Sequence, residues 1–286
     1  MVFPIADDNS DRKAFPIVNV ALIAINVLVF VGLQGMGNNI AFTFAYSTVP
    51  AEIISGQDKV TADEEVVVDT PQGRQKVVVP GLQETPIPVY LTLLTSMFMH
   101  GGIMHLLGNM WFLWIFGDNI EQDMGRVRYL LFYLICGILA SLAHVALNAS
   151  GPNSMIPSLG ASGAISGVMG AYLLLHSRRR VTVLLFRFVT QVPGWVAVGL
   201  WFVFQVVSSL GMLGGMDTGV AYGAHIGGFI AGAALAKPFM IGRSTAPPRN
   251  ERYACSIARP AAGGGGGAHN VVFMRGVGYH IDYVAP

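Results

Sequence analysis

Residues 160–170 read GASGAISGVMG, and they open an apolar segment of about 17 residues that ends at His176 and the basic run 178–180. This stretch predicts a short membrane helix that carries a candidate nucleophile, Ser162. A serine hydroxyl in hydrocarbon has no water to bond, so it needs a partner from another part of the bundle. The flanking glycines predict that neighbouring helices come close enough to supply that partner.

Composition places the chain in a bilayer. Of its 286 residues, 53% are hydrophobic and 12% are charged, whereas about a quarter of the residues of a soluble domain are charged. The formal net charge of +1 gives no clustered basic face, so we expect no nucleic-acid partner. Cys136 and Cys255 lie far apart in the sequence and predict neither a disulfide framework nor a metal site. No cofactor is expected.

Six apolar segments are each close to the roughly 20 residues that span about 30 Å of hydrocarbon. They cover about residues 15–33, 97–116, 127–147, 159–177, 194–213 and 219–239. The sequence therefore predicts an all-α polytopic membrane protein. We expect a polar tail at 1–14, a six-span membrane domain at 15–242 and a Gly/Pro-rich tail at 243–286. Residues 1–14 are too acidic at their start for a secretory signal peptide, so the first span is expected to be retained.

Lysines and arginines near the ends of these segments predict the orientation, because positive charge is retained in the cytoplasm. They precede span one, lie between spans two and three and between spans four and five, and follow span six: Arg12, Lys13, Arg126, Arg128, Arg178, Arg179, Arg180, Arg187, Lys237, Arg243, Arg249 and Arg252. Both termini are therefore expected inside. We interpret the run 178–180 as a topology signal and not as a binding site. No organelle-targeting extension precedes span one, which favours a prokaryotic plasma membrane.

The long connection at about 34–96 falls outside in this topology. Two β-branched runs within it, 65–69 and 76–79, flank the turn composition TPQG at 70–73. This pattern predicts a small exposed hairpin. The connection also carries basic residues, but long loops translocate largely regardless of charge, so they do not change the predicted orientation.

The predicted partner of Ser162 is His225, which begins the stretch AHIGGFIAG at 224–232. His225 shares a helix face with Gly228 and Gly232, a small-xxx-small pair that lets two membrane helices approach closely. Packing this face on the glycines of 160–170 would place an imidazole beside the serine hydroxyl, as a general base beside a nucleophile. Ser166 lies one turn deeper and is a competing nucleophile, although its expected role is an interhelical hydrogen bond.

His105 and Asn109 form a second polar pair in span two. They are four residues apart and therefore lie on one helix face. An imidazole N–H and an amide NH2 can stabilise the oxyanion that forms when serine attacks a carbonyl, and the backbone N–H of Ser162 would be a third donor. Spans two, four and six all enter from the outer side in the predicted topology, so these groups lie at similar depth. The other histidines of this region, at 100, 144 and 176, are expected to be interfacial or exposed.

Taken together, these residues resemble the rhomboid family of intramembrane serine proteases. The resemblance rests on GASG at 160–163, on His100, His105 and Asn109 at their spacing, on AHIGGFIAG at 224–232, and on WIFGDNIE at 114–121. It covers about residues 15–240. It implies a six-helix bundle with a short central fourth helix and a water-accessible cavity that opens outward.

The same resemblance implies a mechanism. Ser162 is expected to be the nucleophile and His225 the general base and then acid, without a third acid, while His105, Asn109 and the Ser162 N–H bind the oxyanion. Substrates would be transmembrane helices of other proteins, locally unwound near the outer surface of the bilayer. The sequence is consistent with a dyad that lacks a third acid, because no carboxylate is well placed behind His225. Asp217 falls in an outer loop and Asp118 near the inner face.

Two positions depart from the family pattern. Some members have an aromatic residue four positions after the nucleophile, packed on the catalytic histidine, and this chain has Ser166 there. The Trp-Arg pair often found in the first outer loop is not apparent in 90–95. The main alternative is a catalytically silent relative that binds membrane helices as a chaperone or escort, but such proteins typically lose the serine or the histidine. A six-span transporter would be expected to show internal repeats, and we find none.

Overall fold

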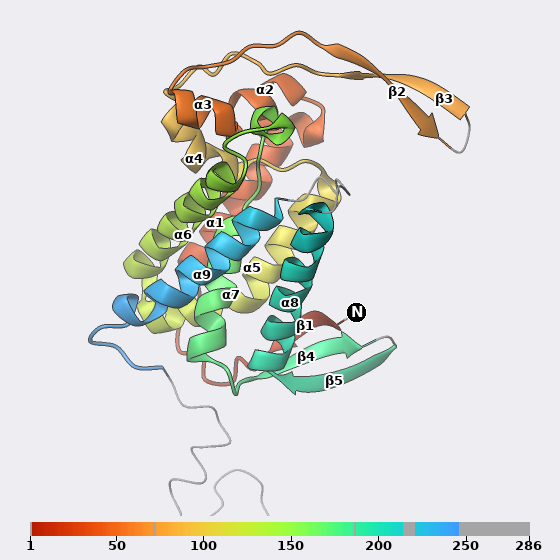
Figure 1. Ribbon diagram of the computed structural model, residues 1–286. Coiled ribbons are helices and arrows are strands. Elements are labelled where there is room, and N and C mark those ends of the chain that lie inside the picture. Colours follow the sequence, from red (N-terminus) through yellow and green to blue (C-terminus); the bar gives the residue numbers. More distant parts are fainter. Residues whose placement is uncertain (1, 71–72, 186, 214–220, 246–286) are drawn as a thin grey trace, which may run out of the picture. The chain divides into compact units, whose positions relative to one another are not determined.

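A bundle of long helices forms the main body of the chain in the computed structural model, which describes residues 2–70, 73–185, 187–213 and 221–245 (Figure 1). The long helices are α1 (Ile17–Leu28, continued by the π-helical turn η1, Val29–Leu33), α5 (Ile103–Met124), α6 (Arg126–Leu147), α7 (Ser162–Leu175), α8 (Gly194–Leu213) and α9 (Tyr222–Phe239). Each falls on one of the six predicted apolar segments. The predicted tail at 243–286, including Cys255, His269 and His280, lies outside the described residues from position 246 onward, as does Asp217.

The second segment differs most from its prediction, because its helix begins at Ile103 and not at 97. Residues Ser96–Phe98 form a separate 3-10 turn, η4, and the chain then runs extended through Met99 into Gly101 and Gly102. The two glycines favour a break here, since glycine loses more conformational freedom than any other residue when it joins a helix. The axes on the two sides of this break differ by 80°.

Length and hydropathy alone identify few membrane spans. Within the described ranges, α6 is the one unbroken helix long and apolar enough to cross a bilayer, and the bent pair 89–98 and 103–124 would add a second if it forms one span. The apolar helices 17–33, 162–175 and 194–208 are shorter. Large apolar side chains nevertheless point outward from α1, α6 and α8, with Leu28, Val127 and Val207 each at least 60% exposed. Six spans therefore remain a prediction.

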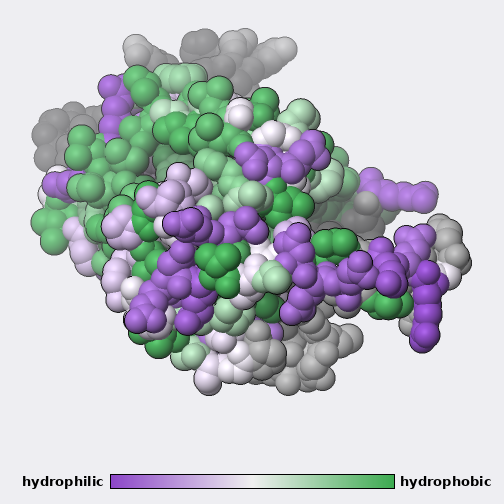
Figure 2. All heavy atoms as spheres, turned by 90° about the horizontal axis from the view of Figure 1, so that it is seen from above, coloured by the Kyte–Doolittle hydropathy of each residue, from purple (hydrophilic) through white to green (hydrophobic). Residues whose placement is uncertain are grey.

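Small elements cover one end of the bundle, which we call the loop end. They are η2 (Gly35–Gly37), α2 (Ile40–Ala45), α3 (Pro50–Ser55), η3 (Val89–Leu91), α4 (Thr92–Thr95), η5 (Pro152–Met155) and the strands β2 (Glu64–Thr70) and β3 (Gly73–Val79). The strands pair antiparallel from Glu64–Val79 to Thr70–Gly73, which confirms the predicted hairpin. Seen from the loop end, hydrophilic residues form a band that runs out along this hairpin, and hydrophobic residues cover the flank beside it (Figure 2).

The opposite end, which we call the sheet end, carries a small antiparallel sheet that the all-α prediction missed. Its strand order is β1 (Val2–Asp7), β4 (Arg180–Leu185) and β5 (Phe188–Pro193). Val181 and Val183 of β4 are fully buried, and this alternation is typical of a strand with one face on a core. The indole N–H of Trp111 in α5 donates to the carbonyl oxygen of Pro4 at 2.8 Å. The segment predicted as a polar tail is thus packed against the bundle.

Arg179 joins this N-terminal segment to the end of α7. Its guanidinium donates to both carboxylate oxygens of Asp11 at 2.7 Å, and it also donates to the carbonyl oxygen of Asp8. Both side chains of the ion pair are at most 4% exposed. Arg12 pairs with Asp118 beside it. The charge of Arg179 is thus paired inside the fold, while the role of the run 178–180 in orientation stays a prediction.

We expect Arg179→Leu to lower the free energy of unfolding by about 3 kcal/mol, since breaking a buried pair leaves the carboxylate of Asp11 buried without its partner. The measurement is a denaturation curve of the purified protein in detergent. Arg180→Leu is the matched control, because the side chain of Arg180 is exposed. A loss of the same size in both variants would contradict a specific role for the buried pair.

The carboxyl group of Asp7 at the sheet end is expected to make the stability of the fold depend on pH. Burial raises the pKa of this carboxyl to about 8, with a smaller contribution from the nearby charge of Asp118, and the Arg179 guanidinium opposes both. Its Oδ2 accepts hydrogen bonds from Asn119 and, at 3.2 Å, from the Tyr172 hydroxyl. The folded protein therefore keeps a proton that the unfolded chain releases near pH 4.

Stability is consequently expected to fall as pH rises from about 4 to 8, because the folded state binds the extra proton over that interval. We expect the melting temperature to drop by about 5 °C between pH 6 and pH 8.5. Asp7→Asn should flatten this slope, since an amide does not ionise. Melting curves of both proteins in one detergent over this pH range test the prediction, and an unchanged slope in the variant would contradict it.

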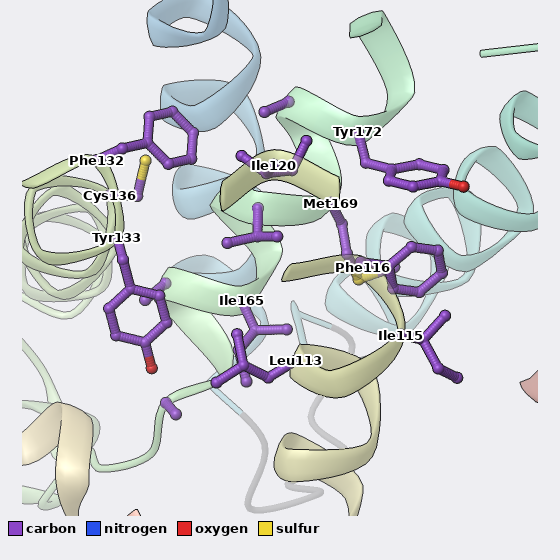
Figure 3. Packing of buried hydrophobic residues seen from close by; sticks show 14 of the residues in the cluster. Leu113, Ile115, Phe116, Ile120, Phe132, Tyr133, Cys136, Ile165, Met169 and Tyr172 are labelled. Carbon is purple, nitrogen blue, oxygen red and sulfur yellow. The ribbon is translucent and has the colours of Figure 1, made fainter. Parts of the chain in front are cut away.

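The centre of the bundle is α7, which packs against α5, α6, α8 and α9. Every residue from Gly163 to Tyr172 is buried. Bulky apolar side chains from α5 and α6 pack around it, as the cluster with Ile165, Met169 and Tyr172 shows (Figure 3). On another side α9 approaches so closely that a Cβ at Gly228 or Gly232 would overlap a carbonyl oxygen of α7. The small-residue face predicted for span six is thus the face that contacts α7.

Candidate active site

The contact between α7 and α9 brings Ser162 and His225 together. Ser162 is the first residue of α7, and His225 lies in the first turn of α9. The hydroxyl Oγ of Ser162 and the ring nitrogen Nε2 of His225 are 2.8 Å apart, which is hydrogen-bonding distance. The close approach of Gly228 to the Gly163 carbonyl sets this distance, because no side chain separates the two helices at that level.

The other ring nitrogen of His225 faces Gln205 of α8. Nδ1 lies 2.7 Å from the amide oxygen Oε1 of Gln205. An amide oxygen can only accept a hydrogen bond, so this contact fits the tautomer with the hydrogen on Nδ1, in which Nε2 has a free lone pair towards Ser162. The sequence reasoning missed Gln205. A signal was present, since a polar amide in an apolar membrane segment is a functional candidate by default.

His105 and Asn109 reach the same place from α5. The backbone N–H of Gly101 donates to Nδ1 of His105 at 3.3 Å, so Nε2 of His105 carries the hydrogen and can donate. A Cβ at Gly160 would lie 2.9 Å from this Nε2 and 3.6 Å from the Oγ of Ser162, so glycine keeps the space between the two groups open. Gly160 has φ +123°, a conformation that also favours glycine.

Asn109 is buried, and its side-chain nitrogen Nδ2 has no hydrogen-bond partner within the described ranges. A buried donor without a partner costs about 1–3 kcal/mol, so its presence needs a reason. An amide donor held ready for a charge that develops only during a reaction would supply one.

One cavity of about 1110 Å³ connects these groups. Its walls come from α5, α7, α8, α9 and the loops at the loop end, and they include Ser162, His225, Gln205, His105 and Asn109. The volume is ample for a short extended peptide segment, since pockets for small ligands range from about 300 to 1,000 Å³. Polar groups line the floor beside apolar and aromatic walls, so a peptide carbonyl and apolar side chains could both be accommodated.

Aromatic rings flank His225 although Ser166 replaces the ring seen in some relatives. The ring centroid of Trp201, from α8, is 6.2 Å from that of His225, and the centroid of Tyr222, from α9, is 6.3 Å away. Ser166 is fully buried, and its hydroxyl donates to the carbonyl oxygen of Ser162 at 2.6 Å. This bond lies within α7, which corrects the expected interhelical bond. Ser166 is also absent from the cavity wall.

Two of the histidines expected at an interface are buried. His100 is fully buried at the loop end, where Gln34 holds its backbone N–H and C=O at 2.9 Å and its ring centroid lies 5.3 Å from that of His105. His176 is buried at the sheet end, with its Nε2 2.7 Å from a carboxylate oxygen of Asp123. The expectation that these two histidines are interfacial or exposed was wrong. It rested on their position near the ends of apolar segments, which does not show their contacts with other elements. His144 is half-buried and lines the cavity.

No group of three or more His, Cys, Asp or Glu side chains that could hold a metal ion occurs in the part of the chain that the structure describes. The side chains that line the site offer a hydroxyl, imidazoles and amides. Such a set can carry out nucleophilic attack with general-base assistance.

We expect Asn109→Ala to lower the rate of any acyl transfer at Ser162 by about 10²-fold, because one preorganised donor is lost while others remain. Activity assays on a cleavable substrate measure the effect. Asn119→Ala, which removes a buried amide at the sheet end of the same helix, is the control for lost stability, and the folded variant should keep its activity. Full activity in Asn109→Ala would remove this residue from the oxyanion site.

Comparisons with known proteins show which family the part of the chain that carries this site resembles. The sequence model of the family described as Rhomboid domain matches residues 88–241, more than half of the chain. The chain is 37% identical over 150 residues to the rhomboid protease GluP of Bacillus subtilis, covering 51% of this chain and 26% of that protein.

Two eukaryotic relatives give a similar picture. The chain is 36% identical over 138 residues to RHOMBOID-like protein 6, mitochondrial, of Arabidopsis thaliana, covering 46% of this chain and 42% of that protein. It is 30% identical over 154 residues to Rhomboid protein 1, mitochondrial, of Saccharomyces cerevisiae, covering 53% of this chain and 42% of that protein. The matched part thus spans less than half the length of each of these curated relatives.

Proposed function

The chain belongs to the rhomboid family of intramembrane proteases, and we propose that it is a serine endopeptidase that cleaves transmembrane segments with Ser162 and His225. The distance of 2.8 Å between the serine hydroxyl and the imidazole, inside a cavity, is the observation that carries this proposal. A serine hydroxyl is a weak nucleophile until an adjacent base removes its proton. His225 occupies the position of that base, with the required nitrogen towards Ser162.

The reaction has two halves. Ser162 Oγ attacks the peptide carbonyl carbon while its proton passes to His225 Nε2, and the carbonyl oxygen becomes an oxyanion. The C–N bond then breaks as the imidazolium returns that proton to the leaving amine. Water attacks the acyl-serine ester with His225 again as base, and collapse of the second intermediate restores the hydroxyl of Ser162.

The oxyanion is bound in this proposal by His105 Nε2–H, the Asn109 amide and the backbone N–H of Ser162. The last of these lies at the N-terminus of α7, where backbone N–H groups are free and the helix dipole favours negative charge. In this proposal three donors from two helices meet the oxyanion beside the nucleophile. This arrangement stabilises charge that appears only in the transition state.

Transmembrane helices of other proteins are the proposed substrates. A helix in hydrocarbon has every backbone group bonded internally, so a scissile carbonyl reaches Ser162 only where the helix is locally unwound. The cavity provides polar groups that can satisfy the freed backbone. Small or helix-breaking residues in the substrate are therefore expected at the cleavage site.

The six-span topology, with both termini in the cytoplasm and the cavity facing outward, is part of the proposal. It is supported by the basic residues near the sheet end, which include Arg12 and Arg126, and by the family's polytopic helical architecture. The protein is an integral membrane protein. Its relatives include a bacterial and several mitochondrial proteins, so the prokaryotic plasma membrane stays a prediction.

A reconstitution experiment tests the function. Purified protein is placed in liposomes with a single-span reporter whose transmembrane helix contains small and helix-breaking residues, and the fragments are identified by mass spectrometry. We expect cleavage by the wild type and none by Ser162→Ala, with Ser166→Ala as the matched control. Cleavage that persists in Ser162→Ala would contradict the proposal. Reporter binding without cleavage by the folded wild type would favour the helix-binding chaperone or escort instead.

A further inference from the structure

Gln205 is a buried amide in an otherwise apolar stretch of α8. It is 7% exposed, and residues 194–204 before it, GWVAVGLWFVF, contain no polar side chain apart from the indoles. Burying an amide without a hydrogen bond costs roughly 1–3 kcal/mol in proteins, so a residue in such a place needs a partner. The partner that the structure provides is Nδ1 of His225, at 2.7 Å.

We infer that Gln205 is a positioning residue that holds His225 in the tautomer and orientation needed to accept the proton of Ser162. This inference rests on the proposed function and adds a third residue to the pair. The amide oxygen accepts the Nδ1–H, so the lone pair of the imidazole is fixed on Nε2, 2.8 Å from the Ser162 hydroxyl. If the amide NH2 faced the ring instead, Nε2 would carry the hydrogen and could not act as the base.

A neutral amide can hold the imidazole without a permanent charge. Within the described ranges the hydrogen bonds of the His225 ring go to Gln205 and Ser162 and to no carboxylate. When His225 accepts a proton, the bond from Nδ1 to the Gln205 oxygen becomes charge-assisted and therefore stronger. Gln205 thus stabilises the protonated imidazole during the reaction without placing a permanent charge in the bundle.

The same helix supports the face of the imidazole as well as its edge. Trp201 lies four residues before Gln205, on the same face of α8, and its ring is 6.2 Å from that of His225. The indole is itself held between Phe112 of α5 and Phe229 of α9, at 6.4 and 6.3 Å. Trp201 and Gln205 thus both lie beside the ring of His225.

The test uses two near-isosteric variants. Gln205→Met keeps the volume and removes the acceptor, and we expect it to lower kcat about 30-fold with KM within about twofold, because general-base catalysis is worth about 10²–10⁴-fold and the wrong tautomer impairs it. Gln205→Glu keeps an oxygen at the same place and is expected to restore kcat to within about threefold of the wild type. Gln191→Met, in exposed β5, is the matched control.

A tautomer measurement separates positioning from a merely structural role. In protein labelled with nitrogen-15 at histidine, the signals of His225 are identified by their loss in His225→Ala. We expect a protonated Nδ1 and a bare Nε2 in the wild type and in Gln205→Glu, and a shift of the proton towards Nε2 in Gln205→Met. An unchanged tautomer, or a kcat in Gln205→Met within twofold of the wild type, would overturn the inference.

The two proposals fail in different ways. If the wild type cleaves the reporter and a fluorophosphonate probe labels Ser162 while Gln205→Met is fully active, the proposed protease function is retained and the positioning role is rejected. If the folded wild type neither cleaves the reporter nor is labelled by the probe, both the proposed function and the positioning role are rejected. A parallel fall of melting temperature and kcat in Gln205→Met with the His225 tautomer retained would reduce Gln205 to a packing residue.

Discussion

His225→Ala is expected to lower kcat by about 10⁴-fold or more while the bundle stays folded. Among the described residues, the imidazole of His225 is the base within hydrogen-bonding distance of the Ser162 hydroxyl. Without it the hydroxyl attacks at its intrinsic, very low rate. The cost to stability is limited to about 1–3 kcal/mol, because the Gln205 amide loses its partner and a cavity remains.

A double variant makes this prediction sharper. Residues that act as one unit show non-additive effects, so Ser162→Ala combined with His225→Ala should be no slower than either single variant. Cleavage of the reporter and melting curves are measured on all three proteins. Activity above about 1% of the wild type in His225→Ala, or the loss of its fold, would mean that His225 packs the bundle and does not serve as the base.

Gly232→Leu is expected to prevent the stable bundle from forming. A Cβ at this position of α9 would overlap the carbonyl group and Cα of Gly167 in α7. The obstacle is backbone inside a helix and cannot rotate away as a side chain could, so the two helices must separate. Gly232→Ala adds only the Cβ and is the milder substitution, with a melting temperature expected to be at least about 5 °C below that of the wild type. Activity should fall with it, because the packing of α9 on α7 also sets the distance between Ser162 and His225.

Gly199→Ala in α8 is the matched control for this effect. A Cβ there meets nothing within 4 Å, and alanine is favoured over glycine in a helix by about 0.5–1 kcal/mol. Melting curves should therefore show an unchanged or slightly raised melting temperature for Gly199→Ala and a large drop for Gly232→Ala. Equal melting temperatures in the two variants would contradict the close backbone contact between α7 and α9.

The helices and the hairpin that follow from local sequence patterns could be predicted. Hydropathy locates all six long helices, and turn composition locates the β2–β3 hairpin, because both depend on local patterns. The contact between Ser162 and His225 could also be expected, since the glycines on each helix mark the faces that approach. Their catalytic roles remain part of the proposal.

Contacts that depend on helix rotation or on distant pairing could not be predicted in the same way. Gln205 faces His225 only because of the rotation of α8, which the nearly uniform apolarity of that helix does not encode. Strand β1 pairs with β4 across about 175 residues of chain, and six residues are too few to identify a strand without its partner. The buried Arg179–Asp11 pair follows from that pairing, so the arginine run by itself did not predict it.

Labelling with a fluorophosphonate probe tests the central claim, that Ser162 is an activated nucleophile, most directly. The probe reacts with serines made nucleophilic by an adjacent base, and it needs no knowledge of the natural substrate. We predict that the purified wild type and Ser166→Ala are labelled, that Ser162→Ala is not, and that mass spectrometry finds the adduct on Ser162. No labelling of a folded wild type, or loss of labelling in Ser166→Ala alone, would contradict the account.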